Sequence, residues 1–424
     1  MTKGWQLRAY LALRPALQPL MRLALRRRVR AGKDDPARVG EKLGLATRPR
    51  PAGRVVWMHA VGLGEAMALR PLILAMQAQA PDLSFVITST ARSSAQVLGQ
   101  NLPPRCVHQF LPLDGPAFLR SFLDHWRPDL SVWSEQDLWP GAIHDCAARG
   151  IPLAYVNARM NDASHRRRAR LEGLYRDTLA RFAIIAAQDA TTAQNLHRLG
   201  AGAVTVTGSL KPAAEPLAAD PAALADLAAT LRGRRIWVAA STHAADEAVV
   251  MAAQSALAVE DPNWLLILAP RVPDRRAEVA VALQTAGLSH ALRSAGQRPA
   301  TADAVWLADS FGELGLWYRL AGAAYVGASF GGVGGHNPWE AICLSCPVLH
   351  GPDVANFAAD YAALDAMGLA HQVTDRAEGA DSLAAHLRRV GAEDTARMQA
   401  VIDAARQALA PLASDLVALI RARP

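Results

Sequence analysis

Short apolar runs alternate along this chain with longer stretches that are rich in alanine and leucine and have helical periodicity. Such an alternation is typical of parallel sheets built from βαβ units, whose buried strands are almost entirely apolar. The first series of expected strands is Val55–Met58, Phe85–Thr88, Leu130–Trp133, Leu153–Val156, Ala183–Ala186 and Val204–Val206. The second series is Ile236–Ala239, Leu265–Leu268, Val305–Leu307, Ala323–Val326 and Pro347–Leu349. The pattern therefore predicts an α/β protein with two parallel sheets.

The two series are separated by residues 208–216, which contain two prolines. Proline lacks a backbone N–H and interrupts regular structure, so we expect a hinge here. We therefore predict two Rossmann-like domains that face each other across a cleft. The expected boundaries are 1–32 for an N-terminal helix, 33–211 for the first domain and 212–424 for the second. The periodic stretch 395–423 is predicted to be helical, and the last helices are expected to return to the first domain.

The positive charge of the chain is concentrated at its N-terminus. Residues 1–50 contain thirteen Lys or Arg and three Asp or Glu, a local charge of +10, so the remaining residues carry −3 of the total of +7. Arginines interrupt the leucines of this segment too often for a spanning helix, which needs about twenty mostly apolar residues. We predict an amphipathic helix on an anionic membrane surface, where each basic side chain contributes roughly 1 kcal/mol. An ordinary basic helix packed on the domain is the alternative, and nucleic acid is not expected because no recognition motif is present.

The chain has four cysteines, Cys106, Cys146, Cys343 and Cys346, which are too few and too scattered for a disulfide framework. They fit a reducing compartment. Cys343 and Cys346 have the spacing of metal ligands, but no second pair or suitably spaced histidines accompanies them. We therefore predict that both are small buried residues and that the protein holds no metal.

Glu65 is the first candidate for chemistry. It follows the first expected strand through a loop that contains Gly62 and Gly64. Open α/β sheets hold their ligands at such junctions, and a carboxylate there can act as a base. A dinucleotide site is disfavoured, because Met67 stands where the third glycine of that fingerprint is required.

A second carboxylate, Glu135, follows the expected strand Leu130–Trp133 and so belongs to the same rim as Glu65. Lys211 lies in the predicted hinge. Two carboxylates and a nearby cation can divide the work of a base and of charge stabilisation between them. An exposed acid beside the start of a helix is the alternative for each carboxylate.

The second half of the chain has two glycine-containing turns after strands, at 309–314 and 330–340. Glycines there let backbone N–H groups approach an anion, which predicts a nucleotide pocket, with Glu340 accepting hydrogen bonds from ribose. Arg271 ends another strand and is a candidate phosphate ligand. The run 241–243 either binds phosphate or caps the next helix. The arginines at 275–276 are expected to be solvated.

The motifs together, in this order and spacing, resemble the Kdo (3-deoxy-D-manno-octulosonic acid) transferase family. The matching segments are 59–65, 135–140, 157–160, 187–188, 206–211, 241–243, 270–271, 312–314 and 334–340. They cover essentially the whole chain. The resemblance implies the two-domain glycosyltransferase B fold.

The resemblance also implies a function. It is the transfer of Kdo from CMP-Kdo to the tetraacyl disaccharide precursor of lipid A (lipid IVA), in lipopolysaccharide synthesis on the cytoplasmic face of the inner membrane. Glu65 is implied as the general base, and Glu135 and Lys211 as groups that stabilise the transition state. The implied CMP contacts are Pro270, Arg271, Phe311, Gly312, Glu313, Asn337, Pro338, Trp339 and Glu340. No cofactor is implied.

The sequence departs from the family pattern at a few positions on the rims of these sites. Asp137 stands where a second glutamate is usual, Val272 stands where a histidine is usual, Ala244 and Ala245 replace an acid and a glycine, and the run 328–330 is altered. Two alternatives to Kdo transfer are kept. One is another glycosyltransferase B enzyme that uses a different nucleotide sugar, and the other is a non-catalytic membrane-bound paralogue.

Overall fold

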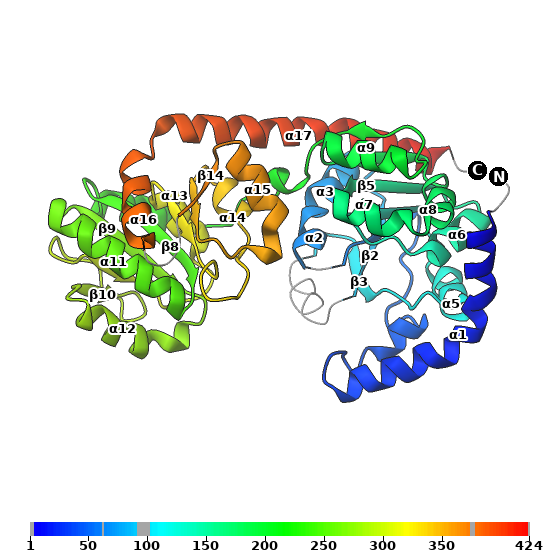
Figure 1. Ribbon diagram of the computed structural model, residues 1–424, viewed down its shortest axis with the longest axis horizontal. Coiled ribbons are helices and arrows are strands. Elements are labelled where there is room, and N and C mark those ends of the chain that lie inside the picture. The colour runs from blue at the N-terminus through cyan, green and yellow to red at the C-terminus, as the bar shows by residue number, and fades with distance from the viewer. Residues whose placement is uncertain (1–3, 62, 91–101, 374–377, 423–424) are drawn as a thin grey trace. The chain divides into compact units, whose positions relative to one another are not determined.

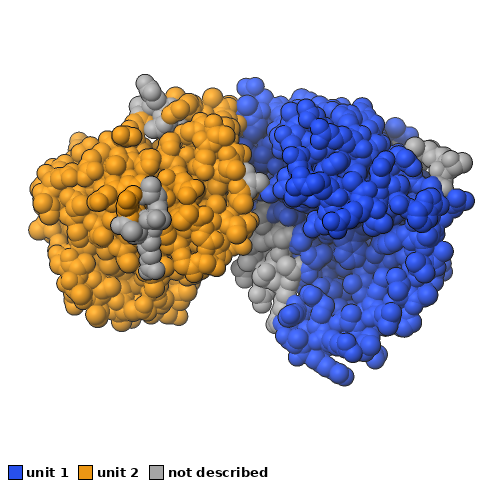
Figure 2. Space-filling model, viewed as in Figure 1, with its two compact units in different colours: residues 1–214, 404–424 blue, residues 215–403 orange. Residues whose placement is uncertain are grey.

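The chain forms two compact units (Figures 1 and 2). The computed structural model describes residues 4–61, 63–90, 102–373 and 378–422. Unit 1 comprises Met1–Ala214 and Ala404–Pro424, and unit 2 comprises Glu215–Asp403. Each unit is built around its own parallel sheet.

The sheet of unit 1 has seven parallel strands in the order β3-β2-β1-β4-β5-β6-β7. Their bounds are β1 Val55–His59, β2 Ser84–Ser89, β3 Cys106–Phe110, β4 Leu130–Ser134, β5 Leu153–Ala158, β6 Ile184–Ala187 and β7 Thr205–Val206. The six strands expected from the apolar runs are all present with bounds that shift by at most two residues. The edge strand β3 was not predicted.

Helices cover both faces of this sheet. Their bounds are α2 Leu63–Ala68, α3 Arg70–Gln79, α5 Pro116–Trp126, α6 Pro140–Ala148, α7 Asp162–Ala169, α8 Glu172–Leu179 and α9 Ala190–Arg198, with 3-10 turns η1 Val39–Leu43 and η2 Lys211–Ala213. Alternate strand residues reach opposite faces. Val56 and Met58 pack in one buried cluster, and Trp57 and Trp133 pack in another with α5 and α6. Since both faces are covered, most residues of the central strands are apolar.

The C-terminal helix α17 (Ala392–Arg421) supplies part of the core of unit 1. From its second half, Leu409, Leu412, Leu416 and Ile420 are buried in the cluster that holds Val56 and Met58. These residues recur at spacings of three and four, so they form one face of the helix.

Unit 2 repeats the architecture with seven parallel strands in the order β10-β11-β9-β8-β12-β13-β14. The strands are β8 Arg235–Thr242, β9 Trp264–Pro270, β10 His290–Leu292, β11 Val305–Leu307, β12 Ala324–Val326, β13 Val348–His350 and β14 Ala370–Gln372. The helices are α10 Pro221–Thr230, α11 Ala244–Glu260, α12 Arg276–Thr285, α13 Leu314–Leu320, α14 Trp339–Ile342, α15 Ala358–Ala366 and α16 Gly379–Arg389, with the 3-10 turns η3 Pro273–Arg275 and η4 Ala355–Phe357. The five expected strands are present, and the edge strands β10 and β14 are additional.

The N-terminal helix α1 (Trp5–Arg30) packs on the rest of unit 1 through both apolar and polar side chains, with Leu7, Arg14 and Leu25 buried. Arg14 is buried and pairs with Asp114 (3.3 Å) and Asp145 (2.9 Å), and Tyr10 donates a hydrogen bond to Asp114. Within the described residues, no helix combines the length and the apolar character that crossing a bilayer requires. The face of α1 that points away from unit 1 is apolar, and its leucines are largely exposed.

Candidate functional site

The candidate residues of unit 1 follow neighbouring strands of its sheet. Glu65 lies in the first turn of α2, just after β1, and Glu135 directly follows β4. Strands β1, β4 and β5 are adjacent and parallel, so their carboxyl ends meet at one edge. Asn157, near the end of β5, and Lys211, in η2, complete the group. The sheet therefore brings together the three residues implied as catalytic.

Glu65 is a carboxylic acid with a strongly perturbed pKa. Its Oε2 accepts a hydrogen bond from the N–H of Val61 at 2.9 Å. Burial and then the charge of Glu135 raise the pKa of Glu65 to about 7, against the opposing effects of the Val61 hydrogen bond and of Lys211. A carboxyl group with a pKa near neutrality is suited to exchange protons at physiological pH. Gly62, which was expected to shape this loop, lies outside the described residues.

Glu135 is the centre of a buried polar network. Its Oε1 lies 3.3 Å from Lys211 Nζ and accepts a hydrogen bond from Asn157 Nδ2 (3.2 Å). Its Oε2 lies 3.9 Å from Arg159 Nη1. The side chain is 3% exposed, so an unpaired charge at this position would be costly. Asn157 also accepts a hydrogen bond from the N–H of Leu210 (3.1 Å), which fixes the segment that carries Lys211.

Two residues of this network have a left-handed backbone. The φ angle is +60° at Glu135 and +49° at Asn157. Such conformations cost of the order of 1–3 kcal/mol for residues other than glycine and cluster at functional sites. The strain is a second indication that the rim at β4 and β5 is shaped for binding or chemistry rather than for stability.

A buried histidine–aspartate pair lies beside these carboxylates and was not predicted. His59, the last residue of β1, is fully buried, and its Nε2 lies 3.2 Å from Asp137 Oδ2. Its Nδ1 lies 3.0 Å from Thr88 Oγ1. Burial acts to raise the pKa of Asp137, but hydrogen bonds from His59 and Trp139 outweigh it and the net pKa is lowered. The residues are 78 positions apart, so sequence spacing gave no signal for the pair.

The candidate residues of unit 2 also lie at the carboxyl ends of adjacent strands, here β11, β9, β8 and β12. Pro270 ends β9, and Arg271 is exposed just after it, with its backbone N–H bound to the carbonyl of Thr242 (3.0 Å). A small pocket at this edge is lined by Ser241, Ala269, Pro270, Arg271, Ser310, Phe311, Gly312, Leu314 and Trp317. The structure thus brings four of the nine implied CMP contacts, Pro270, Arg271, Phe311 and Gly312, to one pocket.

Glu313 differs from these neighbours because its carboxylate already has a partner. It forms an ion pair with Arg293 (2.7 Å) and accepts a hydrogen bond from Ser310. Burial acts to raise the pKa of Glu313, but these two contacts outweigh it and the net pKa is lowered. Arg293 follows the unpredicted strand β10, so the sequence did not indicate this pair.

The run from Asn337 to Glu340 forms the start of the short helix α14. Asn337 Oδ1 accepts the N–H of Trp339 (3.2 Å), and Trp339 is buried with its indole donating to Asp360 (2.9 Å). Pro338 occupies the N-cap. Burial raises the pKa of Glu340. The hydrogen bond with Asn337 and the charge of Arg271 partly offset this rise. The side chain of Trp339 therefore points into the protein, whereas Glu340 shares its electrostatic environment with Arg271.

The loop before this helix is organised by Asp246, which sequence reasoning missed. Asp246 is fully buried near the start of α11. Its carboxylate accepts hydrogen bonds from the backbone N–H groups of His243, Ala328, Ser329 and Phe330 and from the hydroxyl of Tyr325, at 2.8–3.2 Å. His243 takes the N-cap position of α11, so this run caps the helix.

The same loop places two histidines together. His243 Nε2 and His336 Nε2 are 3.4 Å apart, and the rings stack. Burial, followed by the charges of Arg271 and His243, lowers the pKa of His336 to about 4. Four glycines of the run 331–335 have positive φ, which explains why glycine recurs there.

Three predictions about other side chains can be compared with the structure. Arg275 is not solvated as expected, because it is partly buried and binds both Glu247 (2.9 Å) and Glu278 (2.6 Å). Of its two acidic partners, Glu247 lies in the first turn of α11 and Glu278 in the first turn of α12. Cys343 and Cys346 are buried, as predicted.

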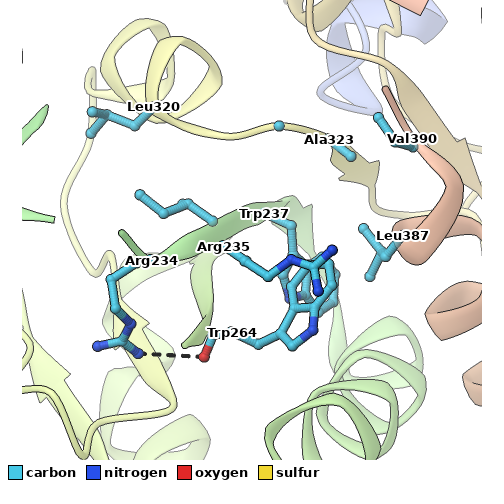
Figure 3. Close-up of a pocket in the computed structure, with 10 residues that line it drawn as sticks. Arg234, Arg235, Trp237, Trp264, Leu320, Ala323, Leu387 and Val390 are labelled. Atoms are coloured by element: carbon cyan, nitrogen blue, oxygen red, sulfur yellow. Dashed lines mark hydrogen bonds between the residues drawn. The ribbon is translucent and has the colours of Figure 1, made fainter. Parts of the chain in front are cut away.

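A larger pocket of unit 2 lies at the other end of the strands, near their amino ends (Figure 3). It is lined at the amino ends of β8 and β9 by Arg234, Arg235, Trp237 and Trp264, among others. Arg234 donates to five backbone carbonyls, including that of Trp264 (3.4 Å), and Arg235 stacks on the indole of Trp264. Ligands of α/β sheets bind at the carboxyl ends of strands, so this pocket is not the candidate site.

Solved structures of known proteins share this architecture. The UDP-GlcNAc 2-epimerase of Neisseria meningitidis bound to UDP-GlcNAc superposes with a TM-score of 0.55 at 15% identity, covering 87% of this chain and 100% of that one. CalG4, the calicheamicin glycosyltransferase, superposes with a TM-score of 0.51 at 12% identity, covering 88% and 100%. At this identity the likeness establishes the fold alone, two Rossmann-like α/β domains.

Sequence comparison is more specific. The family model described as 3-deoxy-D-manno-octulosonic-acid transferase (kdotransferase) matches residues 37–214. The 3-deoxy-D-manno-octulosonic acid transferase of Rickettsia bellii is 32% identical over 349 residues, 82% of this chain and 83% of the relative. That of Bordetella pertussis is 37% identical over 360 residues, again 82% and 83%, and that of Haemophilus influenzae is 32% identical over 76% of each chain. The protein therefore belongs to the Kdo transferase family and is a glycosyltransferase.

Proposed function

We propose that this glycosyltransferase transfers Kdo from CMP-Kdo to lipid IVA, with Glu65 as the general base. The observation that carries the mechanism is the pKa of Glu65, raised to about 7 by burial and by Glu135. A base with this pKa is ionised in a large fraction of molecules at neutral pH and still binds a proton strongly. It can therefore take the proton of a sugar hydroxyl as the oxygen attacks the anomeric carbon of Kdo.

Lys211 and Glu135 are proposed to act on charge rather than on the proton. When CMP leaves with the bonding electrons, positive charge develops on the sugar and negative charge on the phosphate. Lys211 supplies a cation, and Glu135, held by Asn157 and Arg159, supplies a fixed anion that also orients Lys211. Fixed groups of this kind stabilise a transition state without reorganising during the reaction.

Unit 2 is proposed to bind the CMP part of the donor. Arg271 is exposed beside the pocket that contains Ser241 and Gly312, where a guanidinium can pair with a phosphate. Glu340 is a candidate acceptor for ribose hydroxyls. The assignment of cytidine as the base comes from membership of the Kdo transferase family.

The acceptor and the location are proposed from α1. Trp5, Leu13 and Leu20 are 71%, 59% and 61% exposed on this helix, although large apolar side chains are usually buried. Leu13, Leu17 and Leu20 follow the spacing of one helix face, and arginines flank them. Such a helix suits the surface of an anionic membrane, which is where a lipid acceptor is found. We therefore propose peripheral attachment to the cytoplasmic face of the inner membrane.

The reaction is tested by Glu65→Gln with CMP-Kdo and lipid IVA, using mass spectrometry of the product. Removing a general base is expected to lower kcat about 10²–10⁴-fold. Glu172→Gln, an exposed glutamate of the same unit, is the matched control and should retain wild-type kcat. Wild-type kcat should rise with pH through about 7 as Glu65 ionises, and this step should vanish in the variant.

Three results count against the proposal. Unchanged transfer by Glu65→Gln removes Glu65 as the base. Turnover of another nucleotide sugar, with none of CMP-Kdo, indicates a different glycosyltransferase activity. Absence of turnover with every donor, by a folded wild-type protein that binds the lipid, favours the non-catalytic paralogue.

A further inference from the structure

We propose that the groove between α1 and η1 binds one anionic membrane phospholipid, whose phosphate pairs with arginines of α1 and whose acyl chain enters the groove. The proposal rests on the membrane association proposed above and adds a defined lipid site to it. This site lies on the side of α1 that faces the protein, apart from the exposed leucines.

The groove has the size and the lining of a ligand site. It is lined by Arg22, Leu25, Arg26, Val29 and Arg30 of α1 and by Val39 and Leu43 of η1. Its volume is about 350 Å³, and ligand pockets commonly measure about 300–1,000 Å³. Leu25 is buried beneath it, while Val29, Val39 and Leu43 are partly exposed to it. The apolar part of the lining thus comes from two elements that meet along the groove.

Arg22, Arg26 and Arg30 form a ladder along one side of this groove. They are spaced four residues apart, so they lie one above another on α1. Each is exposed, and Arg22 also lies over the ring of Phe118 at 5.2 Å. Arginine buries its aliphatic stem along apolar surface while its guanidinium stays at the polar edge.

The ladder has no acidic partner among the residues that the structure describes. Residues 1–33 contain no aspartate or glutamate. Of the next three acids, Asp34 pairs with Arg28 and Lys42, and Glu41 pairs with Arg38. Asp35 accepts the backbone N–H of Ala37. Among the residues that the structure describes, no ion pair within 4.0 Å involves Arg22, Arg26 or Arg30. Phosphate matches the donor geometry of guanidinium groups, so the charge favours a phosphorylated ligand.

The apolar lining favours an amphiphile over free phosphate. A free anion on the ladder would leave the groove of Val29, Val39 and Leu43 in contact with water. An acyl chain removes that apolar surface from water, which stabilises the complex by about 0.8 kcal/mol for each buried CH₂ group. The opposite face of α1 carries the exposed leucines, so a helix resting on the membrane holds the ladder at the depth of the phosphates.

The test uses the full chain and a short-chain phosphatidylglycerol below its micelle concentration, with binding followed by calorimetry and native mass spectrometry. We expect one saturable site. Arg26→Gln with Arg30→Gln should weaken it about thirtyfold, since each arginine near an anionic surface contributes roughly 1 kcal/mol. The matched control is Arg8→Gln with Arg27→Gln, which removes the same charge from exposed positions of α1 and should leave the affinity unchanged.

A second variant tests the acyl chain. Val29→Trp fills the groove and should abolish lipid binding. Inorganic phosphate should bind both the variant and the wild type too weakly to reach saturation. Equal weakening by the two arginine pairs, or equal binding of lipid and inorganic phosphate, overturns the proposal. If Val29→Trp does not fold, the arginine pairs decide alone. Kdo transfer in detergent is measured separately, so failure of the proposed reaction is distinguishable from failure of the lipid site.

Discussion

At the scale of single residues, Glu65 combines two opposing requirements. Burial and the neighbouring Glu135 make its ionised form unfavourable, while the Val61 N–H and Lys211 partly compensate. A carboxylate whose ionised form is destabilised by its surroundings is a stronger base. The ionisation of that carboxylate also makes the folded protein less stable. The proposed catalytic role therefore carries a stability cost that depends on pH.

Glu65→Gln should accordingly stabilise unit 1 at pH 8. The pKa of Glu65 is about 7 in the folded protein and near its ordinary 4.5 when unfolded, so ionisation opposes folding above pH 4.5. The increase in the stability of unit 1 should be full above about pH 7 and shrink as the pH falls. It should disappear below pH 4.5, where Glu65 is protonated in both the folded and the unfolded protein. Thermal unfolding of the variant and of Glu172→Gln across this range measures it. A gain that does not change with pH contradicts the assignment.

The residue types at the strand ends predicted part of this site. The remaining contacts became evident only from the structure, which shows which strands are neighbours. Glu135 and Lys211 were expected to act together, and they form an ion pair. The pairing of His59 with Asp137 was not predicted, because it depends on the adjacency of β1 and β4 rather than on spacing in the chain. Asp246 was missed for the same reason, since three of its partners, Ala328, Ser329 and Phe330, lie more than eighty residues away.

At the scale of elements, all the central strands were predictable, whereas of the four edge strands only β7 was predicted. β1 and β4 are buried on both faces, so their sequences are mainly apolar. β3, β10 and β14 each have one sheet neighbour and contain histidine or glutamine. Their pattern is too short and too polar to distinguish from a loop. The helix α1 was predicted, but the sequence did not show which face contacts the protein.

The exposed face of α1 gives a prediction about membrane binding. Leu13→Gln, Leu17→Gln and Leu20→Gln together should lower partitioning into phosphatidylglycerol vesicles by about a hundredfold or more, because fully burying each leucine contributes about 1.5–3 kcal/mol. Sedimentation with vesicles measures this. Thermal unfolding should not change, since these side chains are exposed in the folded protein.

The control triple is Leu45→Gln, Leu171→Gln and Val259→Gln, which alters exposed apolar residues outside α1 and should bind vesicles like the wild type. Deleting α1 is a poorer test, because it also removes Arg14 from Asp114 and Asp145. Unchanged sedimentation of the α1 triple contradicts attachment through this face.

At the scale of the whole molecule, the chain builds two separate cores but does not assign them to two halves of the sequence. Residues 404–424 belong to unit 1, although almost two hundred residues of unit 2 precede them. Six side chains of α17, Leu409, Leu412, Ala413, Leu416, Val417 and Ile420, are buried in the cluster with α3. The core of unit 1 therefore lacks part of its side chains until residues 404–424 have been synthesised.

Truncation after residue 403 should consequently damage unit 1 and spare unit 2. Loss of a buried leucine side chain alone costs about 2–5 kcal/mol, so losing this helix exceeds the 5–15 kcal/mol that typically stabilises a domain. Calorimetry of residues 1–403 should show only the transition that residues 215–403 show alone, and proteases should digest the remainder. Joining residues 404–424 to residue 214 through a Gly/Ser linker should restore the transition of unit 1. A chain of residues 1–403 that unfolds like the full protein contradicts a structural role for the end of α17.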